Sequence, residues 1–510
     1  MRHPRLAAVA LALSVSLALS GCVSWFLPPT ANSTSTPTGE EVAADLAPYY
    51  RQILAWSSCG GGMQCATAIA PLDWSDPGAA DIELALVRKP ATSSNRVGSL
   101  LVNPGGPGGS GYDFIRDSVD YATDARLQAS FDIVGFDPRG VNRSTAVSCY
   151  TDPTELDSYL YDIAPGTPGS DSWLEALSAG SKAFGERCLE LTGPLLAHVD
   201  TPSAARDLDM LRAALGDLTL NYLGYSYGTL LGQVYAELFP NKTGRLVLDG
   251  AVDPAASDFE GTAAQAKGFE SALKAFLVDC SAASDCPFTG SVDDSLVEIR
   301  ALLDTLDASP LRNDDGRRLG SGAMFTAIIL PLYNQSNGQY LRQLFGEVFK
   351  GDASYAFQLA DNYNGRNTDG TYRDNQTEAF ISINCLDEHG DGDLVSMRAE
   401  AAELKKLAPV FGPQMSWGGT GCPNWPVPAQ RTRGPISASG STDILVVGTT
   451  NDPATPYSWA VAVASTLVKG HLVTYDGEGH TAYNKSNSCV NDVVDDFFIN
   501  GTVPESDPKC

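Results

Sequence analysis

Three residue types that can act together in nucleophilic catalysis lie far apart along the chain. Ser226 is the central residue of the segment GYSYG, a G-x-S-x-G pattern. Asp452 lies in the stretch NDPATP, and His480, one of only five histidines, lies in GEGHT. A serine hydroxyl is a weak nucleophile unless a histidine takes its proton and a carboxylate orients that histidine. These residues therefore predict acyl transfer, provided that the fold brings them together.

Each of the three candidates directly follows, or ends, an apolar run that is typical of a β-strand. Strands are expected at 81–89, 98–103, 131–137, 220–226, 244–250, 443–449 and 471–476. Helical patterns lie between and after them, at about 203–215, 227–239, 456–468 and 489–499. This alternation is typical of a mostly parallel sheet with flanking helices. Ligands bind such sheets beyond the carboxyl ends of the strands, so the three side chains should gather at one edge.

A glycine-rich segment, NPGGPGGSG, follows the strand expected at 98–103. Glycines allow the backbone to approach a ligand closely and to direct N–H groups at developing negative charge. A phosphate-binding loop is the alternative, but the Lys and Thr of that motif do not follow. We expect an oxyanion hole made by the backbone N–H groups of Gly105, Gly106 and Tyr227, the last at the start of a helix.

The order of the candidates along the chain narrows the choice of fold class. Asp452 alone would be interpreted as a turn former or a helix cap. His480, flanked by glycines after the last strand, is the best general base, because the other four histidines have no such setting. Serine, aspartate and histidine in this order, each after a separate strand, is typical of α/β-hydrolases. We therefore predict an α/β-hydrolase fold with Ser226 as nucleophile, Asp452 as orienting acid and His480 as base.

The N-terminus has the pattern of an export signal. Two arginines precede an apolar run that is too short for a comfortable membrane span, and the run ends in LSGC. This ending resembles the lipobox of bacterial lipoproteins, in which the cysteine, here Cys22, is lipidated; an ordinary secretory signal is the alternative. Residues 1–21 are the expected signal peptide, and the Ser-, Thr- and Pro-rich residues 22–41 the expected tether. The chain is expected to be exported and anchored to the outer face of the cell membrane.

Cysteine usage agrees with an oxidising compartment. Apart from Cys22, the 11 cysteines leave an even number. Spacing suggests that neighbours pair, although it cannot prove connectivity, as Cys59–Cys65, Cys149–Cys188, Cys280–Cys286, Cys385–Cys422 and Cys489–Cys510. A metal site is the rival interpretation, but no C-x-x-C occurs and histidines are few. We expect disulfides, and neither a metal nor another cofactor.

Together, these motifs resemble the actinobacterial secreted tripeptidyl-aminopeptidase-type α/β-hydrolases, relatives of prolyl aminopeptidases, and most of all the lipid-anchored mycobacterial cell-envelope serine proteases with esterase activity. The matching stretches are NPGGPGGSG, FDIVGFDPRGVNRST, GYSYGT, YAELFP, RLVLDGAVDP, NDPATP and GEGHT. The resemblance implies a serine exopeptidase acting on free N-termini. It also implies that Asp137 and Arg139 form a structural pair and that Thr455 supports Asp452. Asn142 departs from the usual glycine, but Asn tolerates left-handed geometry.

The sheet pattern is interrupted between about 258 and 437, where amphipathic helical runs occur. The hydrolase core is thus expected at 42–257 and 438–510, and the resemblance implies that 258–437 is a mostly helical cap, inserted before the strand that precedes Asp452, which sets specificity. An aminopeptidase needs a carboxylate for the substrate's ammonium group. Asp387 and Glu388 are the candidates, with a solvated acidic loop as the alternative.

The net charge of the chain indicates which classes of partner it can bind. The formal net charge of −27 argues against nucleic acid and would attract cationic substrates, although an acidic surface kept for solubility is the better general explanation. Three functions remain: an aminopeptidase cleaving peptides from free N-termini, a carboxylesterase or lipase with the same triad, and a non-catalytic binding lipoprotein. We expect the first, as a monomer.

Overall fold

The computed structural model describes residues 33–388, 390 and 392–510, so the predicted signal peptide and Cys22 lie outside the described residues. One ten-stranded sheet forms the base of the molecule, in the order β1-β2-β3-β4-β6-β5-β7-β8-β11-β12. The strands β6, β5, β7, β8, β11 and β12 pair in parallel, while β1 to β4 are antiparallel and β4 joins β6 antiparallel. The strands are β1 (Ser33–Thr34), β2 (Ala55–Gly60), β3 (Met63–Pro71), β4 (Asp81–Lys89), β5 (Gly98–Asn103), β6 (Phe131–Phe136), β7 (Leu220–Tyr225), β8 (Thr243–Asp249), β11 (Ile444–Asn451) and β12 (Gly470–Glu478).

Helices cover both faces of this sheet, as the apolar strands require. Successive residues of β8 point to opposite sides: Leu246 and Leu248 pack in one hydrophobic cluster and Val247 in another. The first cluster includes residues of α7 and α8, and the second residues of α3 and α18. The helices of the core are α2 (Ala47–Tyr50), α3 (Gly111–Ala122), α4 (Ala125–Ser130), α7 (Thr201–Leu215), α8 (Tyr227–Leu238), α17 (Tyr457–Thr466) and α18 (Ser488–Asn500), with short 3₁₀ turns η1 (Gly193–His198) and η2 (Pro240–Lys242).

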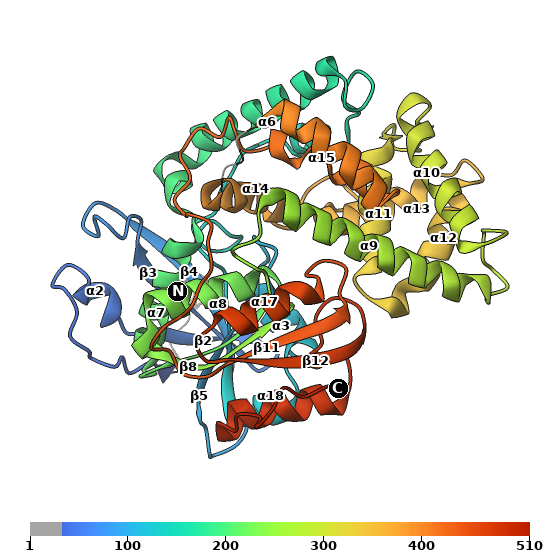
Figure 1. Ribbon diagram of the computed structural model, residues 1–510. Coiled ribbons are helices and arrows are strands. Elements are labelled where there is room, and N and C mark those ends of the chain that lie inside the picture. The colour runs from blue at the N-terminus through green and yellow to red at the C-terminus, as the bar shows by residue number, and fades with distance from the viewer. Residues whose placement is uncertain (1–32, 389, 391) are drawn as a thin grey trace, which may run out of the picture.

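A helical layer with a hydrophobic cluster of its own lies above the carboxyl ends of the parallel strands (Figure 1). It contains α9 (Asp258–Ser281), α10 (Val292–Ala308), α11 (Ser321–Leu332), α12 (Gly338–Val348), α13 (Ser354–Asn364), α14 (Gln376–Asp387), α15 (Leu394–Leu407) and α16 (Phe411–Met415), the small hairpin β9 (Leu311–Arg312) and β10 (Arg318–Leu319), and the turns η3 (Gln335–Asn337) and η4 (Gly418–Thr420). We call this layer the cap.

An earlier part of the chain also joins the cap, which the sequence did not predict. Helices α5 (Pro153–Tyr161) and α6 (Asp171–Thr192) leave the core between β6 and α7. Figure 1 shows α6 alongside α15 at the top of the molecule, and the rings of Trp173 and Trp417 lie 6.1 Å apart in an edge-on contact. The cap is therefore built from two separate insertions.

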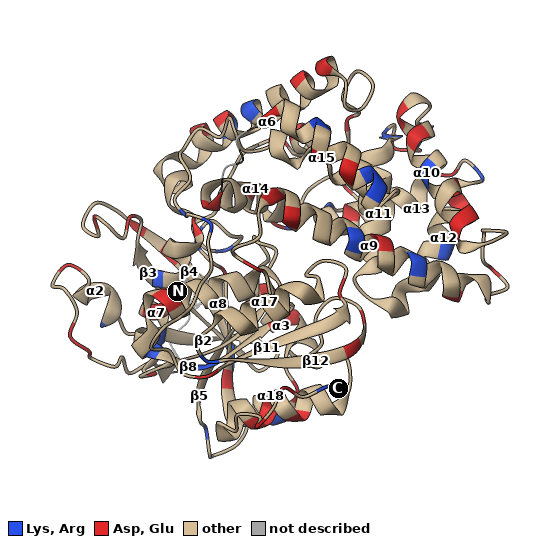
Figure 2. Ribbon diagram, viewed as in Figure 1, with Lys and Arg blue, Asp and Glu red and all other residues tan. Residues whose placement is uncertain are grey.

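All five expected cysteine pairs form disulfides in the structure. Cys385–Cys422 lies within the cap, while Cys489–Cys510 ties α18 to the C-terminus. Acidic residues are spread over both layers rather than gathered in one patch (Figure 2). Among the helices of the described residues, none combines the length and apolar character that crossing a membrane requires.

Candidate active site

Ser226 occupies a sharp turn between β7, which ends at Tyr225, and α8, which begins at Tyr227. Its backbone has φ 55° and ψ −126°, a strained conformation for a residue with a side chain. The turn needs both flanking glycines: a Cβ on Gly224 would lie 2.4 Å from the carbonyl oxygen of Gly228, and a Cβ on Gly228 would lie 2.9 Å from that of Asn103. This is the strand–turn–helix context in which G-x-S-x-G presents a nucleophile.

Asp452 and His480 follow β11 and β12 and contact each other. Both carboxylate oxygens of Asp452 lie 2.9 Å from Nδ1 of His480. The Asp452 side chain is fully buried, whereas the imidazole keeps 13% of its surface exposed. A buried carboxylate beside Nδ1 fixes the tautomer that leaves Nε2 free to accept a proton.

Other donors hold the Asp452 carboxylate in place. One oxygen accepts hydrogen bonds from the backbone N–H groups of Ala454 and Thr455, both at 2.9 Å. The second accepts from the Thr455 hydroxyl at 2.9 Å and from the N–H of Thr481 at 3.1 Å. The supporting hydrogen bond from Thr455 therefore has the expected partner. These hydrogen bonds hold both carboxylate oxygens in place, which the orienting role requires.

The end of β8 lies between the serine turn and the histidine. The N–H of Ser226 donates to the carbonyl oxygen of Asp249 at 2.9 Å. A Cβ on the next residue, Gly250, would lie 3.2 Å from Cε1 of His480 and 2.9 Å from Oγ1 of Thr455. The segments that bear the three candidate residues thus meet around one strand end, as the order of the strands predicted.

The glycine-rich loop lies against the serine turn, but one predicted oxyanion donor is wrong. A Cβ on Gly105 would lie 2.9 Å from Cβ of Ser226 and 3.1 Å from the nitrogen of Tyr227. The N–H of Gly105, however, donates to Oδ1 of Asn103 at 2.8 Å and is not available to a substrate. The N–H groups of Gly106 and Tyr227 remain as candidates; that of Tyr227 begins α8 and has no acceptor within the helix.

The two charged residues of the DPRG segment do not form the expected structural pair. Asp137 and Arg139 are both buried but do not pair with each other. Asp137 accepts from the hydroxyl of Ser110 at 2.5 Å, at the end of the glycine-rich loop, and burial raises its pKa. Arg139 instead pairs with Asp207 at 2.7 Å. Asn142 has φ 43°, the left-handed geometry that an asparagine in place of glycine allows.

The two candidate carboxylates for a substrate amine are already engaged, which corrects that prediction. Asp387 is buried and accepts from the N–H and hydroxyl of Thr201, at 2.8 and 2.5 Å. Glu388 forms ion pairs with Arg431 and Arg433. These arginines are more than 40 positions away in the sequence, so the local pattern around Cys385 gave no sign of them.

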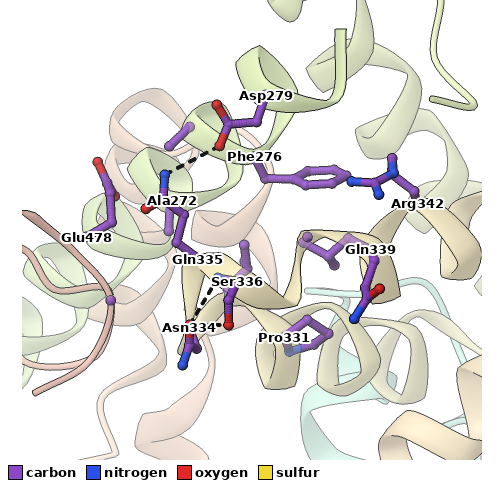
Figure 3. A pocket seen from close by; sticks show the side chains of 15 residues that line it. Ala272, Phe276, Asp279, Pro331, Asn334, Gln335, Ser336, Gln339, Arg342 and Glu478 are labelled. Carbon is purple, nitrogen blue, oxygen red and sulfur yellow. Dashed lines mark hydrogen bonds between the residues drawn. The ribbon is translucent and has the colours of Figure 1, made fainter. Parts of the chain in front are cut away.

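The cap contacts the histidine loop directly, which sequence reasoning missed. The N–H of His480 donates to the carbonyl oxygen of Tyr333 at 2.9 Å, and the two rings lie 5.4 Å apart. Beside this contact a cavity of about 290 Å³ separates α9, the chain around η3 and the residues before His480 (Figure 3). Glu478 lines it, and burial, together with the nearby Asp279, raises the Glu478 pKa.

The cavity is not itself the catalytic pocket, because Ser226, Asp452 and His480 are not among its lining residues. It shows that the cap meets the core close to the candidate base. In the part of the chain that the structure describes, no group of three or more His, Cys, Asp or Glu side chains could hold a metal ion.

Comparison with known proteins agrees with the fold and the chemistry. Residues 98–318 match the family described as alpha/beta hydrolase fold, and residues 408–510 match the family described as TAP-like protein. Serine protease Hip1 of Mycobacterium tuberculosis is 37% identical over 467 residues, covering 88% of each chain. Carboxylesterase B of the same species is 37% identical over 514 residues, covering 98% of this chain and 97% of that protein.

A Streptomyces lividans protein named tripeptidyl aminopeptidase is 30% identical over 467 residues, covering 89% of this chain and 86% of that protein. The relatives thus include both peptidases and an esterase, and all extend over the core and the cap. This chain belongs to the same family, the α/β-hydrolase-fold serine hydrolases related to Hip1 and to tripeptidyl aminopeptidase.

Proposed function

We propose that this serine hydrolase is an aminopeptidase that cleaves short peptides from free N-termini, with Ser226, His480 and Asp452 as its catalytic triad. The observation that carries the proposal is the buried Asp452 carboxylate at 2.9 Å from Nδ1 of His480, beside a serine on a strained strand–helix turn. This arrangement supplies a base, its orienting group and a half-buried nucleophile at the carboxyl ends of neighbouring strands.

The reaction follows from these positions. Nε2 of His480 takes the Ser226 proton as Oγ attacks the scissile carbonyl carbon, and the resulting oxyanion accepts hydrogen bonds from the N–H groups of Gly106 and Tyr227. The imidazolium then protonates the leaving amine, and the acyl group remains on Ser226. Water, deprotonated by His480, hydrolyses this ester, and the proton returns to Oγ. Asp452 holds the imidazole in position throughout.

The preference for peptides rests on two observations. The family includes a tripeptidyl aminopeptidase and a serine protease over most of this chain. In addition, the net charge of −27 favours substrates that carry a free ammonium group. Carboxylesterase activity is the second candidate, because Carboxylesterase B is as similar to this chain as Hip1 is.

The decisive comparison uses aminocoumarin amides of a tripeptide and of a single amino acid, each with a free and an acetylated N-terminus, alongside short-chain nitrophenyl esters. The proposal predicts amide cleavage that depends on the free amine and disappears in Ser226→Ala and His480→Ala, both still folded by circular dichroism. Activity confined to esters would overturn the aminopeptidase assignment and leave the carboxylesterase.

We also propose that the protein is exported and anchored through lipid on Cys22, as the lipobox-like LSGC suggests. In a bacterial host, wild-type protein is expected to incorporate labelled palmitate and to partition into detergent. Cys22→Ala should lose both properties. Equal labelling of the variant would contradict lipid attachment at this cysteine.

A further inference from the structure

Lys485 lies in the loop after His480 and touches both segments that the proposed triad needs. Its ammonium donates to Oγ1 of Thr481 at 2.6 Å, directly beside the histidine. The same ammonium lies 4.2 Å from the ring centre of Tyr225, the residue before Ser226, and 4.7 Å from that of Tyr121 on α3. Cations over aromatic rings are held most strongly where water is excluded. Lys485 thus connects the histidine loop with the serine turn.

Thr481 is the residue through which this contact reaches the triad. It is buried and has φ 67°, a strained conformation for a β-branched residue. Its N–H donates to Oδ2 of Asp452 at 3.1 Å, and its hydroxyl donates to the carbonyl oxygen of His480 at 2.6 Å. Since the hydroxyl proton is used in this way, the oxygen is free to accept from Lys485. Strained backbone persists only where surrounding contacts determine it.

Asp249 balances the charge of Lys485 and makes a parallel connection. Its carboxylate accepts from the N–H groups of Ala482 and Tyr483, at 3.0 and 2.8 Å, while its carbonyl oxygen accepts from Ser226. Burial raises the Asp249 pKa to about 6, and nearby Lys485 opposes that rise. Burial likewise lowers the Lys485 pKa to about 8, which the charges of Asp249 and Asp452 oppose.

We propose that Lys485 is a positioning residue for the hydrolase reaction: it holds Thr481 in its left-handed conformation and so fixes the imidazole of His480 relative to Asp452 and Ser226. A proton-transfer group displaced by a fraction of an ångström loses much of its effect on the barrier. This role adds to the triad a half-buried cation that acts through Thr481. The inference rests on the proposed triad.

The test uses Lys485→Met, which keeps much of the side-chain length and removes the charge and the donor. Lys469→Met, at an exposed lysine of the core, is the matched control. Active sites are first titrated with a fluorophosphonate, and kcat and KM for a nitrophenyl ester are then expressed per titrated site. We expect kcat to fall about tenfold or more with KM changed less than about threefold, and the control to equal wild type.

A lysine needed only for folding would give fewer titrated sites, each with normal kcat, and that result would overturn the proposal. Thr481 supplies a second route if Lys485→Met does not fold. Thr481→Val removes the acceptor and should lower kcat similarly, whereas Thr481→Ser keeps it and should remain near wild type. In Lys485→Met/Thr481→Val the two losses should not multiply, because both break one contact.

Multiplying losses, or a Thr481→Val enzyme with wild-type kcat, would also overturn the role of Lys485. Failure of the proposed triad has a different signature, since wild-type protein would then not be labelled at Ser226 at all.

Discussion

Among the single residues, Asp452 is the one whose hydrogen bonds matter most for the proposed catalysis. Two backbone N–H groups, the Thr455 hydroxyl, the N–H of Thr481 and Nδ1 of His480 all point at one buried carboxylate. All of these groups donate hydrogen bonds. An asparagine at position 452 would therefore place its NH₂ group against other donors. The carboxylate, rather than the shape of the side chain, is therefore what orients the imidazole.

Asp452→Asn should consequently abolish most turnover while leaving the fold intact. An amide NH₂ facing Nδ1 selects the wrong histidine tautomer, and the expected loss in kcat is on the order of 10⁴-fold. The measurement is kcat on a nitrophenyl ester, with Asp476→Asn, at an exposed position after Tyr475, as the control. A variant within tenfold of wild type would show that Asp452 is not the orienting acid.

Some of the residues at the site could be predicted from the sequence, and others could not. Ser226, Asp452 and His480 could be predicted because each follows an apolar strand and the spatial order of strands is constrained by the fold, whereas Thr455 was implied only by the family resemblance. Gly105 could not be separated from Gly106, since the acceptor of its N–H is a side chain two residues away. Asp387 and Glu388 were misassigned because their partners, Thr201, Arg431 and Arg433, come from distant segments.

At the scale of elements, the glycine-rich loop and cap helix α14 are packed together. Gly108 has φ 86°, and a Cβ there would lie 2.7 Å from the carbonyl oxygen of Gln376 and 2.9 Å from the nitrogen of Phe380. The start of α14 therefore lies directly on the loop that is proposed to bind the oxyanion. A displacement of α14 would therefore move the glycine-rich loop at the site of the reaction.

Gly108→Ala should accordingly impair both stability and catalysis. Gly351 is a matched control, because it has φ 85° and open space around its missing Cβ. Gly351→Ala should cost only the strain of left-handed backbone, about 1–2 kcal/mol in the free energy of unfolding. Gly108→Ala should cost more and lower kcat about tenfold or more as the loop shifts. Urea unfolding and ester hydrolysis measure the two effects; equal behaviour of both variants would contradict the close packing.

The elements themselves were predictable to different degrees. The seven expected strands occur because buried parallel strands are continuous apolar runs, and their bounds differ by at most two residues. The hairpin of β2 and β3 escaped prediction because most of β2 is exposed and polar, with only Trp56 buried. The packing of α6 against the cap could not be predicted, since its aromatic partners Trp417 and Trp425 lie more than 200 residues later.

At the scale of the whole molecule, buried carboxylates make stability depend on pH. Burial raises the pKa of Asp387 to about 6, although Thr201 and Arg431 oppose the shift. The native state thus binds a proton that the unfolded chain has lost between about pH 4 and pH 6. Under this linkage the contribution of Asp387 to stability decreases as pH rises through that window.

Asp387→Asn removes this titration and keeps an acceptor for Thr201. The free energy of unfolding of the variant, relative to wild type, should therefore increase between pH 4 and pH 7, by about 2–3 kcal/mol at most. Urea titrations at several pH values test this, with the exposed Asp476→Asn as control. A difference from wild type that is the same at every pH would contradict a raised pKa at Asp387.

The proposed reaction depends on one nucleophile at the end of β7, which chemical labelling can identify. Purified protein is treated with a fluorophosphonate, digested and analysed by mass spectrometry. We predict one adduct per chain, on the peptide that contains Ser226, and none in Ser226→Ala. An adduct on another serine, or an equally labelled Ser226→Ala protein, would show that Ser226 is not the nucleophile.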